Sequence, residues 1–111
     1  MQLQTIVYVS DMEQSIEFYE ALGFEVDYRG GPVWTAFRGA DGALALHLVD
    51  ELPAGGRVAV SLVADSALEG ISDRLAEAGI EATPIEAQAF GRSIVVRDPD
   101  GLAIQINEHA S

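Results

Sequence analysis

The chain carries at residues 9–24 the stretch VSDMEQSIEFYEALGF, which predicts a capped amphipathic helix. Asp11 is a favoured N-cap residue, and Gln14 stands three residues later, where a capping box has its second member. Gly23 ends the pattern as a glycine at the C′ position does. The apolar residues in and after the helix follow helical spacing and are expected in the core: Met12, Ile16, Phe18, Tyr19, Leu22 and Phe24.

A strand pattern precedes this helix, three follow it, and the same order then recurs, so the chain is read as one domain (1–111) of two βαβββ modules. The first module (1–54) is expected to have strands at 3–9, 24–29, 33–38 and 43–49. The second module (55–111) is expected to have strands at 57–63, 80–87, 91–97 and 102–107, and a helix that Ser66 caps, with Glu69 at the capping-box position, and Gly79 ends. A module of about 55 residues buries too little apolar surface alone, so the two must share a sheet, within one chain or by exchange with a second.

The composition excludes several classes of function. The chain has no cysteine and no lysine, which excludes disulfides, thiolate sites and Schiff-base chemistry and makes a reducing cytoplasm the expected compartment. Eighteen acidic residues against six arginines give a formal net charge of −12, so a nucleic-acid partner is not expected. A membrane span and a secretory leader are not expected either. The acidity is explained by solubility, by a salt-rich habitat or by a cationic ligand, and these remain open.

The helix at 9–24, the turn Asp98-Pro99-Asp100-Gly101 and the duplicated βαβββ order together resemble the vicinal oxygen chelate superfamily. That superfamily includes glyoxalase I, extradiol dioxygenases and the fosfomycin- and bleomycin-resistance proteins. The resemblance implies an α+β fold in which two modules curl into a cup-shaped mixed sheet with the helices outside. It also implies a homodimer.

Enzymes of this superfamily hold a divalent metal in the cup with side chains from four strands, and the resemblance assigns the positions here. Gln4 takes the first position and Gln105 the fourth. Ala45 or His47 takes the second, and Arg57 or Val58 the third. If zinc, nickel, iron or manganese binds, Gln4, His47 and Gln105 are its ligands. No carboxylate stands at any of these positions, and two amides with one imidazole bind such ions weakly, so no metal is expected.

A cup without metal is a binding site of mixed polar and apolar character. The residues expected to contact a ligand there are Gln4, Ile6, Tyr8, Trp34, Phe37, His47, Arg57, Phe90 and Gln105. Small residues between them leave room for a flat molecule, on which Trp34, Phe37, Tyr8 and Phe90 can stack. Trp34 has the alternative of packing at a dimer interface. Glu108 and His109 follow the last expected strand and are interpreted as a frayed terminus.

The leading hypothesis is therefore a non-catalytic, homodimeric binding protein of the bleomycin-resistance type, which sequesters a cationic or aromatic antibiotic-like ligand in its cup. The loss of carboxylate at every expected ligand position is its basis. The alternative is a metal-dependent enzyme, similar to glyoxalases or dioxygenases, that acts as a lyase, isomerase or oxidoreductase. A ligand-free interaction module is the third reading.

Overall fold

The computed structural model describes residues 1–39, 41–97, 99 and 101–110. Along the chain the first module contains β1 (Gln2–Val9), α1 (Met12–Ala21), β2 (Glu25–Arg29), a short 3-10 turn (Gly31–Val33), β3 (Trp34–Gly39) and β4 (Gly42–Leu48). The second contains β5 (Val58–Val63), α2 (Leu68–Glu77), β6 (Glu86–Gln88), β7 (Gly91–Arg97) and β8 (Ala103–His109). Asp98 and Asp100, which were expected in a tight turn, lie outside the described residues. Within the part described, no helix is long and apolar enough to span a membrane.

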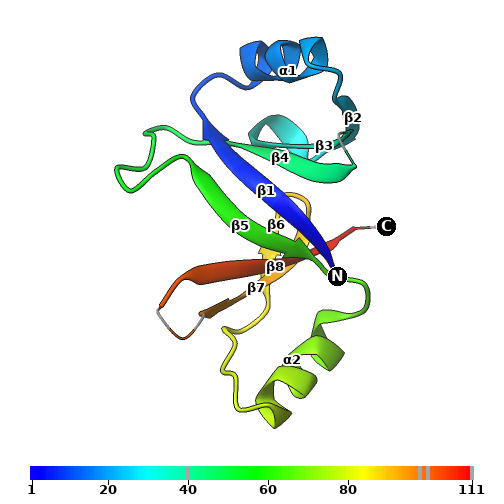
Figure 1. Ribbon diagram of the computed structural model, residues 1–111, viewed down its shortest axis with the longest axis vertical. Helices are drawn as coiled ribbons and strands as arrows, with labels where there is room; N and C mark the ends of the chain where they lie inside the picture. Colours follow the sequence, from blue (N-terminus) through cyan, green and yellow to red (C-terminus); the bar gives the residue numbers. More distant parts are fainter. Residues whose placement is uncertain (40, 98, 100, 111) are drawn as a thin grey trace.

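All eight strands form one sheet in the order β2-β3-β4-β1-β5-β8-β7-β6. The order is symmetric about its centre, where β1 and β5 pair antiparallel, while β1 pairs parallel with β4 and β5 parallel with β8. The two modules of one chain therefore join edge to edge through their first strands. The curled sheet with two helices confirms the expected α+β cup (Figure 1).

The helices lie at opposite ends of the sheet and cover the same side of it (Figure 1). Asp11 accepts a hydrogen bond from the Gln14 N–H, as the sequence predicts, and Met12 and Ile16 of α1 pack on Leu44 and other apolar side chains of the sheet. The second helix packs on Ile94 and Ile106 through its own apolar stripe. Burial of these apolar surfaces holds each helix on its module.

The start of α2 differs from the prediction. Its N-cap is Ala67, and the side chain of Ser66 does not cap it. Glu108 of β8 accepts a hydrogen bond from the Leu68 N–H and pairs with Arg92, so a carboxylate from another strand serves the helix N-terminus. The reading of Glu108 and His109 as a frayed terminus is therefore wrong: both belong to β8.

The strand expected at 80–87 is only three residues long in the structure. β6 covers Glu86–Gln88, and in the chain before it the N–H and hydroxyl of Thr83 both bond to the main chain of Val95 on β7. The apolar residues that suggested a strand contact α2 and β7 instead, because Ala82 and Ile85 join the cluster under the second helix.

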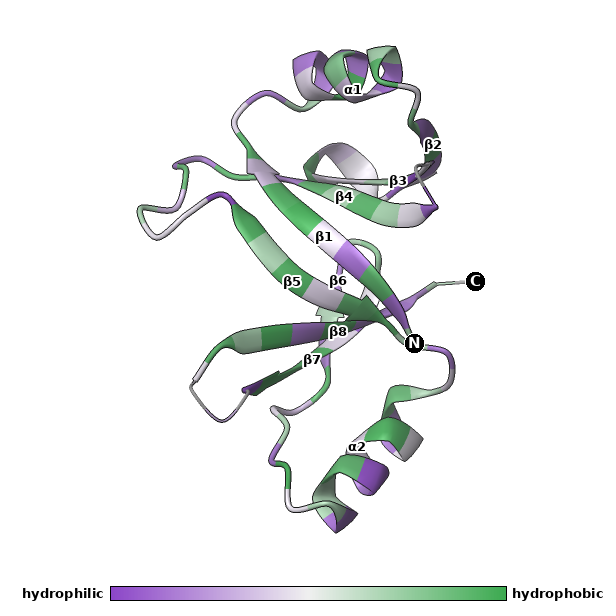
Figure 2. Cartoon of the chain, viewed as in Figure 1, coloured by the Kyte–Doolittle hydropathy of each residue, from purple (hydrophilic) through white to green (hydrophobic). Residues whose placement is uncertain are grey.

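The centre of the sheet is uncovered on the helix side. Leu3, Val58 and Val60 on β1 and β5 are 61%, 66% and 41% exposed. Figure 2 shows β5 as a largely hydrophobic ribbon across the middle of the sheet, between the two helices. The helices are too far apart to cover this seam. Phe18, which was expected in the core, is 60% exposed on α1 and only its edge contacts Tyr19.

Candidate functional site

The face of the sheet away from the helices, called here the cup face, carries side chains in rows that cross the strands. Every second residue of a strand lies on one face, and the pairing registers align these residues between neighbours. The first row contains Trp34, His47, Tyr8 and Arg57; the second contains Ala36, Ala45, Ile6 and Ala59; the third contains Arg38, Ala43, Gln4, Ser61 and Gln105. Seven of the nine residues expected to contact a ligand lie in these rows.

The third row holds the two amides that the resemblance assigned to a metal. Gln4 pairs with Ser61 and Ser61 with Gln105, so these side chains are neighbours across three strands. On the other side of Gln4 stands Ala43. The register thus aligns Ala43 and Ser61 with the amides, in place of the residues expected at the second and third positions, Ala45 or His47 and Arg57 or Val58.

These residues do not fit a metal ion. His47 lies four residues beyond Ala43 along β4, a separation of about 13 Å at roughly 3.3 Å per residue, whereas metal–ligand bonds are about 2 Å long. Gln4, His47 and Gln105 therefore cannot share one ion. Among the residues that the structure describes, no three His, Cys, Asp or Glu side chains are grouped to hold a metal.

The amides of the third row bond to one another. Gln105 Nε2 donates to Asn107 Oδ1 at 2.8 Å, and Asn107 Nδ2 donates to Gln4 Oε1 at 3.2 Å. Ser61 donates to the main-chain oxygen of Gln4. Gln4, Ser61 and Asn107 are fully buried, so this chain of hydrogen bonds satisfies polar groups that have left water. Alternation along β5 and β8 predicts that Ser61 and Asn107 lie on the cup face, and the structure places them there.

The first and second rows form the floor of the cup, and the Phe90 ring packs on it beside Trp34. Trp34 and Phe90 are 2% and 3% exposed, and their ring centroids are 4.4 Å apart. The two rings share a cluster with Ile6 and Ala45. The small residues that were expected to leave room for a ligand are therefore covered by the Phe90 ring, which comes from the turn between β6 and β7. His47 lies beside this floor, with ring centroids 6.0 Å from Trp34 and 5.5 Å from Tyr8.

The expectation that Phe37 stacks on a ligand is wrong. Its ring packs under α1, with centroids 6.0 Å from Tyr19 and 6.3 Å from Phe24, and it is 2% exposed. Trp34 and Phe37 are three residues apart on β3, so their side chains point to opposite faces of the sheet. Arg57 lies at the end of the first row and is exposed, with its Nε donating to the Tyr8 carbonyl at 3.1 Å.

A hollow of about 240 Å³ opens at the other end of the cup, lined by Gln2, Gln4, Asp27, Arg38, Ala43 and His109 among others. Asp27 and Arg38 form an ion pair at 2.9 Å. Burial lowers the pKa of His109, against the opposing effect of the Asp27 carboxylate, and burial also lowers the pKa of His47. Burial therefore favours the neutral form of both imidazoles, which can donate and accept hydrogen bonds.

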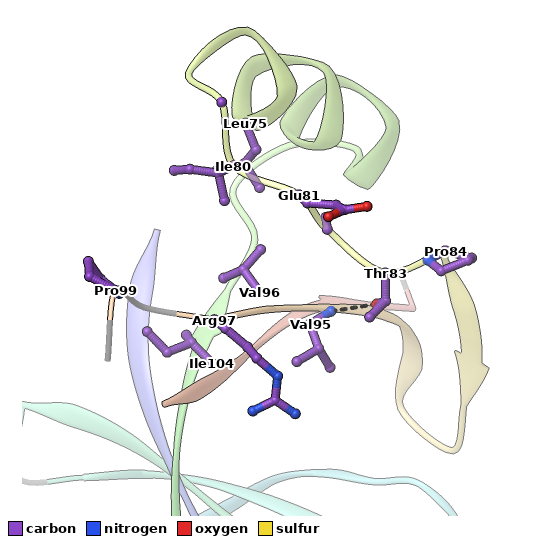
Figure 3. A pocket seen from close by; sticks show the side chains of 12 residues that line it. Leu75, Ile80, Glu81, Thr83, Pro84, Val95, Val96, Arg97, Pro99 and Ile104 are labelled. Carbon is purple, nitrogen blue, oxygen red and sulfur yellow. Dashed lines mark hydrogen bonds between the residues drawn. The ribbon is translucent and has the colours of Figure 1, made fainter. Parts of the chain in front are cut away.

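A second hollow, of about 820 Å³, lies outside the cup between the end of α2 and strands β7 and β8 (Figure 3). It exists because the chain at 80–85 does not pair as a strand with the edge of β7. Its walls are mainly apolar, with Leu75, Ile80 and Ile104 among them, and its Arg97 donates to the Gly101 carbonyl at 2.9 Å. Among its described lining residues no group of polar side chains converges, so the cup is the better candidate site.

Known structures share this fold. The structure of an NAD-dependent benzaldehyde dehydrogenase from Legionella pneumophila has a TM-score of 0.70 at 22% identity, covering 97% of this chain and 99% of that one. The methylmalonyl-CoA epimerase from Mycobacterium tuberculosis has a TM-score of 0.69 at 16% identity, covering 99% and 89%. A glyoxalase/bleomycin resistance protein/dioxygenase superfamily member from Vibrio splendidus 12B01 has a TM-score of 0.60 at 22% identity, covering 96% and 97%.

No curated protein matches the chain. The sequence pattern of one family does match, over residues 2–106, which is nearly the whole length. Together with the paired βαβββ modules and their common cup, this match decides the family. The chain belongs to the Glyoxalase/Bleomycin resistance protein/Dioxygenase superfamily.

Proposed function

We propose that this protein is a non-catalytic binding protein that takes up a small, planar, aromatic molecule in its cup. One observation carries the proposal: the row that holds the two amides expected at metal positions reads Arg38, Ala43, Gln4, Ser61 and Gln105, with no carboxylate and no imidazole. Its amides already bond each other, and the neighbouring rows present aromatic rings. Such a lining binds by stacking and hydrogen bonding.

The geometry gives less support to an enzyme. Catalysis by a general base needs an imidazole or carboxylate within hydrogen-bond reach of a reacting group or a partner. His47 stands among aromatic rings, and its neighbours in the row are Trp34 and Tyr8. The metal-dependent alternative would require His47 to lie beside Gln4, which the β4 register opposes.

The charges of the cup favour a neutral ligand over a cationic one. Among the residues described at the hollow, the carboxylate is that of Asp27, which is paired with Arg38, and Arg57 adds a positive charge at the far end of the cup. The acidic surplus of the chain therefore lies mostly outside the cup. This excess negative charge raises the solubility of the protein and attracts cations at long range, but it does not provide a carboxylate partner for a cation inside the cup.

Titration followed by the fluorescence of Trp34, the single tryptophan, tests the proposal. Mitomycin C represents planar neutral compounds and bleomycin represents cationic ones. We expect saturable quenching by the planar compound, unchanged after dialysis against a chelator, and lost in His47→Ala or Tyr8→Ala. Phe18→Ala is the matched control because that ring is exposed on α1, away from the cup. Stoichiometric metal in the purified protein, with turnover that a chelator abolishes, would refute the proposal.

We also propose that the protein forms the expected homodimer, and that the two copies pair through the uncovered seam of β1 and β5. Leu3, Val58 and Val60 are apolar and exposed there, in a chain whose net charge of −12 keeps copies apart elsewhere. A second copy covers this face without bringing like charges together. Sedimentation of Val60→Glu should give a monomer, whereas Ile80→Glu, at 40% exposure, should behave as the parent. A parent that sediments as a monomer contradicts the proposal. A cytoplasmic location, suited to a chain without cysteine, is proposed with it.

A further inference from the structure

We propose that Phe90 occupies the binding place itself, and that a ligand enters by displacing this ring and offering a hydrogen-bond acceptor to Trp34. The inference rests on the proposed function and names the chemistry of the ligand: a planar ring system with a carbonyl oxygen or a ring nitrogen. It also makes the turn between β6 and β7 the moving part of the site.

The position of Phe90 supports a stand-in role. Its ring belongs to the second module but lies on the cup face of the first, against Trp34, Ile6 and Ala45. The floor beneath it includes a small residue, Ala45, which pairs with Ala36 on the neighbouring strand. The flat Phe90 ring thus packs on a flat, shallow part of the cup face. The planar ring of a ligand has a similar shape and apolar surface, so it can make the same contact.

Two buried polar atoms beside Phe90 lack partners. Trp34 Nε1 and His109 Nε2 have no hydrogen-bond partner in the described structure, although Trp34 is 98% buried. Both belong to rings that contact Phe90, with centroids 4.4 Å and 5.7 Å from it. A phenyl ring has no acceptor for an indole N–H, so Phe90 leaves this group unsatisfied. A heteroaromatic ring in its place can satisfy it.

The turn that carries Phe90 is held by few interactions. β6 is an edge strand of three residues, all exposed. On the side of the first module the turn is held by a hydrogen bond from the Tyr28 hydroxyl to the Ala89 carbonyl, at 3.4 Å, and by close contact with Gly30. On the side of the second, the Ala110 N–H donates to the Phe90 carbonyl at 2.8 Å. The backbone of β6 and of Ala89 is exposed, and exposed segments open locally at lower free-energy cost than buried ones, so the main cost of opening the turn is the separation of the Phe90 ring from Trp34.

Gly30 provides a way to move the turn without removing any ring. A Cβ at this position would stand 2.6 Å from the Ala89 carbonyl oxygen, closer than atoms can approach, so Gly30→Ala must push residues 89–90 away. The φ angle of Gly30 is −99°, outside the left-handed region that favours glycine. This substitution changes the place of Phe90 and leaves every residue of the cup rows intact.

The test compares quinoline with naphthalene, two probes of the same shape of which only quinoline carries an acceptor. Binding is followed by the single indole N–H signal of Trp34 in proton–nitrogen correlation spectra. We expect Phe90→Ala and Gly30→Ala each to bind quinoline at least tenfold more tightly than the parent. We also expect quinoline, but not naphthalene, to move the indole signal downfield. Phe18→Ala should match the parent.

Each outcome decides one part. If both variants bind quinoline no better than the parent, Phe90 does not occupy the site and the inference fails, while binding of mitomycin C by the parent would still uphold the proposed function. If both probes bind the variants equally and the indole signal does not move, the acceptor assignment fails. If Phe90→Ala does not fold, Gly30→Ala decides alone, because it keeps the phenyl ring. If mitomycin C does not bind but quinoline does, mitomycin C is ruled out as a ligand and the proposed site is still supported.

Discussion

Replacement of Asn107 by alanine should destabilise the protein strongly, because this side chain joins the two amides of the cup. Asn107 is fully buried on β8; it accepts from Gln105 Nε2 at 2.8 Å and donates to Gln4 Oε1 at 3.2 Å. Each hydrogen bond contributes about 0.5–1.5 kcal/mol, and a buried polar group left without a partner costs about 1–3 kcal/mol. Gln4 Oε1 keeps only a long contact of 3.5 Å with the Ser61 hydroxyl.

Asn107→Ala should therefore lower the free energy of unfolding by about 2–4 kcal/mol, equivalent to a fall in Tm of roughly 10–25 °C for a domain of this size. Urea denaturation followed by Trp34 fluorescence measures it, with the slope of the transition compared between variants. Gln105→Ala is the control, because it breaks only one of the two bonds and leaves the Asn107 Oδ1 acceptor unpaired, so it should cost about 1–2 kcal/mol, less than Asn107→Ala. A loss below about 0.5 kcal/mol in Asn107→Ala would refute the reasoning that the amide chain is a buried, satisfied network.

Three further outcomes follow from the packing and the charges. Phe37→Ala should lower stability by about 3–5 kcal/mol in thermal or urea unfolding, whereas Phe18→Ala should change it by less than about 1, since only the first ring is buried. Glu108→Ala should lower Tm by removing the acceptor at the start of α2, and Ser66→Ala should not; the reverse order in a melting experiment would contradict the cap assignment. Burial lowers the pKa of both histidines, His47 among them, so the unfolded chain takes up protons first and stability should fall as the pH drops below about 6.5 toward the folded-state values; a Tm that stays constant between pH 7.5 and 5.5 would count against this.

Local pattern predicted the elements well. The apolar residues at helical spacing and the Asp11 N-cap lie within a few residues of each other, so α1 can be predicted from its local sequence alone. Alternation likewise placed Gln4, Tyr8 and Gln105 on the cup face, because a period of two depends only on the strand itself. The same rule separates Trp34 from Phe37, and applying it along β3 would have removed Phe37 from the expected site.

The register between strands that are distant in the sequence could not be predicted from local pattern. Whether Ala43, Ala45 or His47 stands beside Gln4 depends on the register of a parallel pair some forty residues apart, and no local feature marks it. The covering of the floor by Phe90 depends on the sheet curling until its last hairpin reaches its first strands. The cap from Glu108 is equally long-range, forty residues from Leu68, and a nearby serine was the stronger local signal.

The meeting of Trp34 and Phe90 has a consequence for how the two halves of the chain depend on each other. The sole tryptophan belongs to residues 1–54 and the ring that shields it to residues 55–111. An isolated first half would leave its indole in water, and the fluorescence maximum of Trp34 would move to shorter wavelength only when the second half docks and buries the ring. Trp34 therefore reports the assembly of the two modules. When separately produced halves are mixed, a shift of the Trp34 fluorescence maximum would show whether they still bind each other.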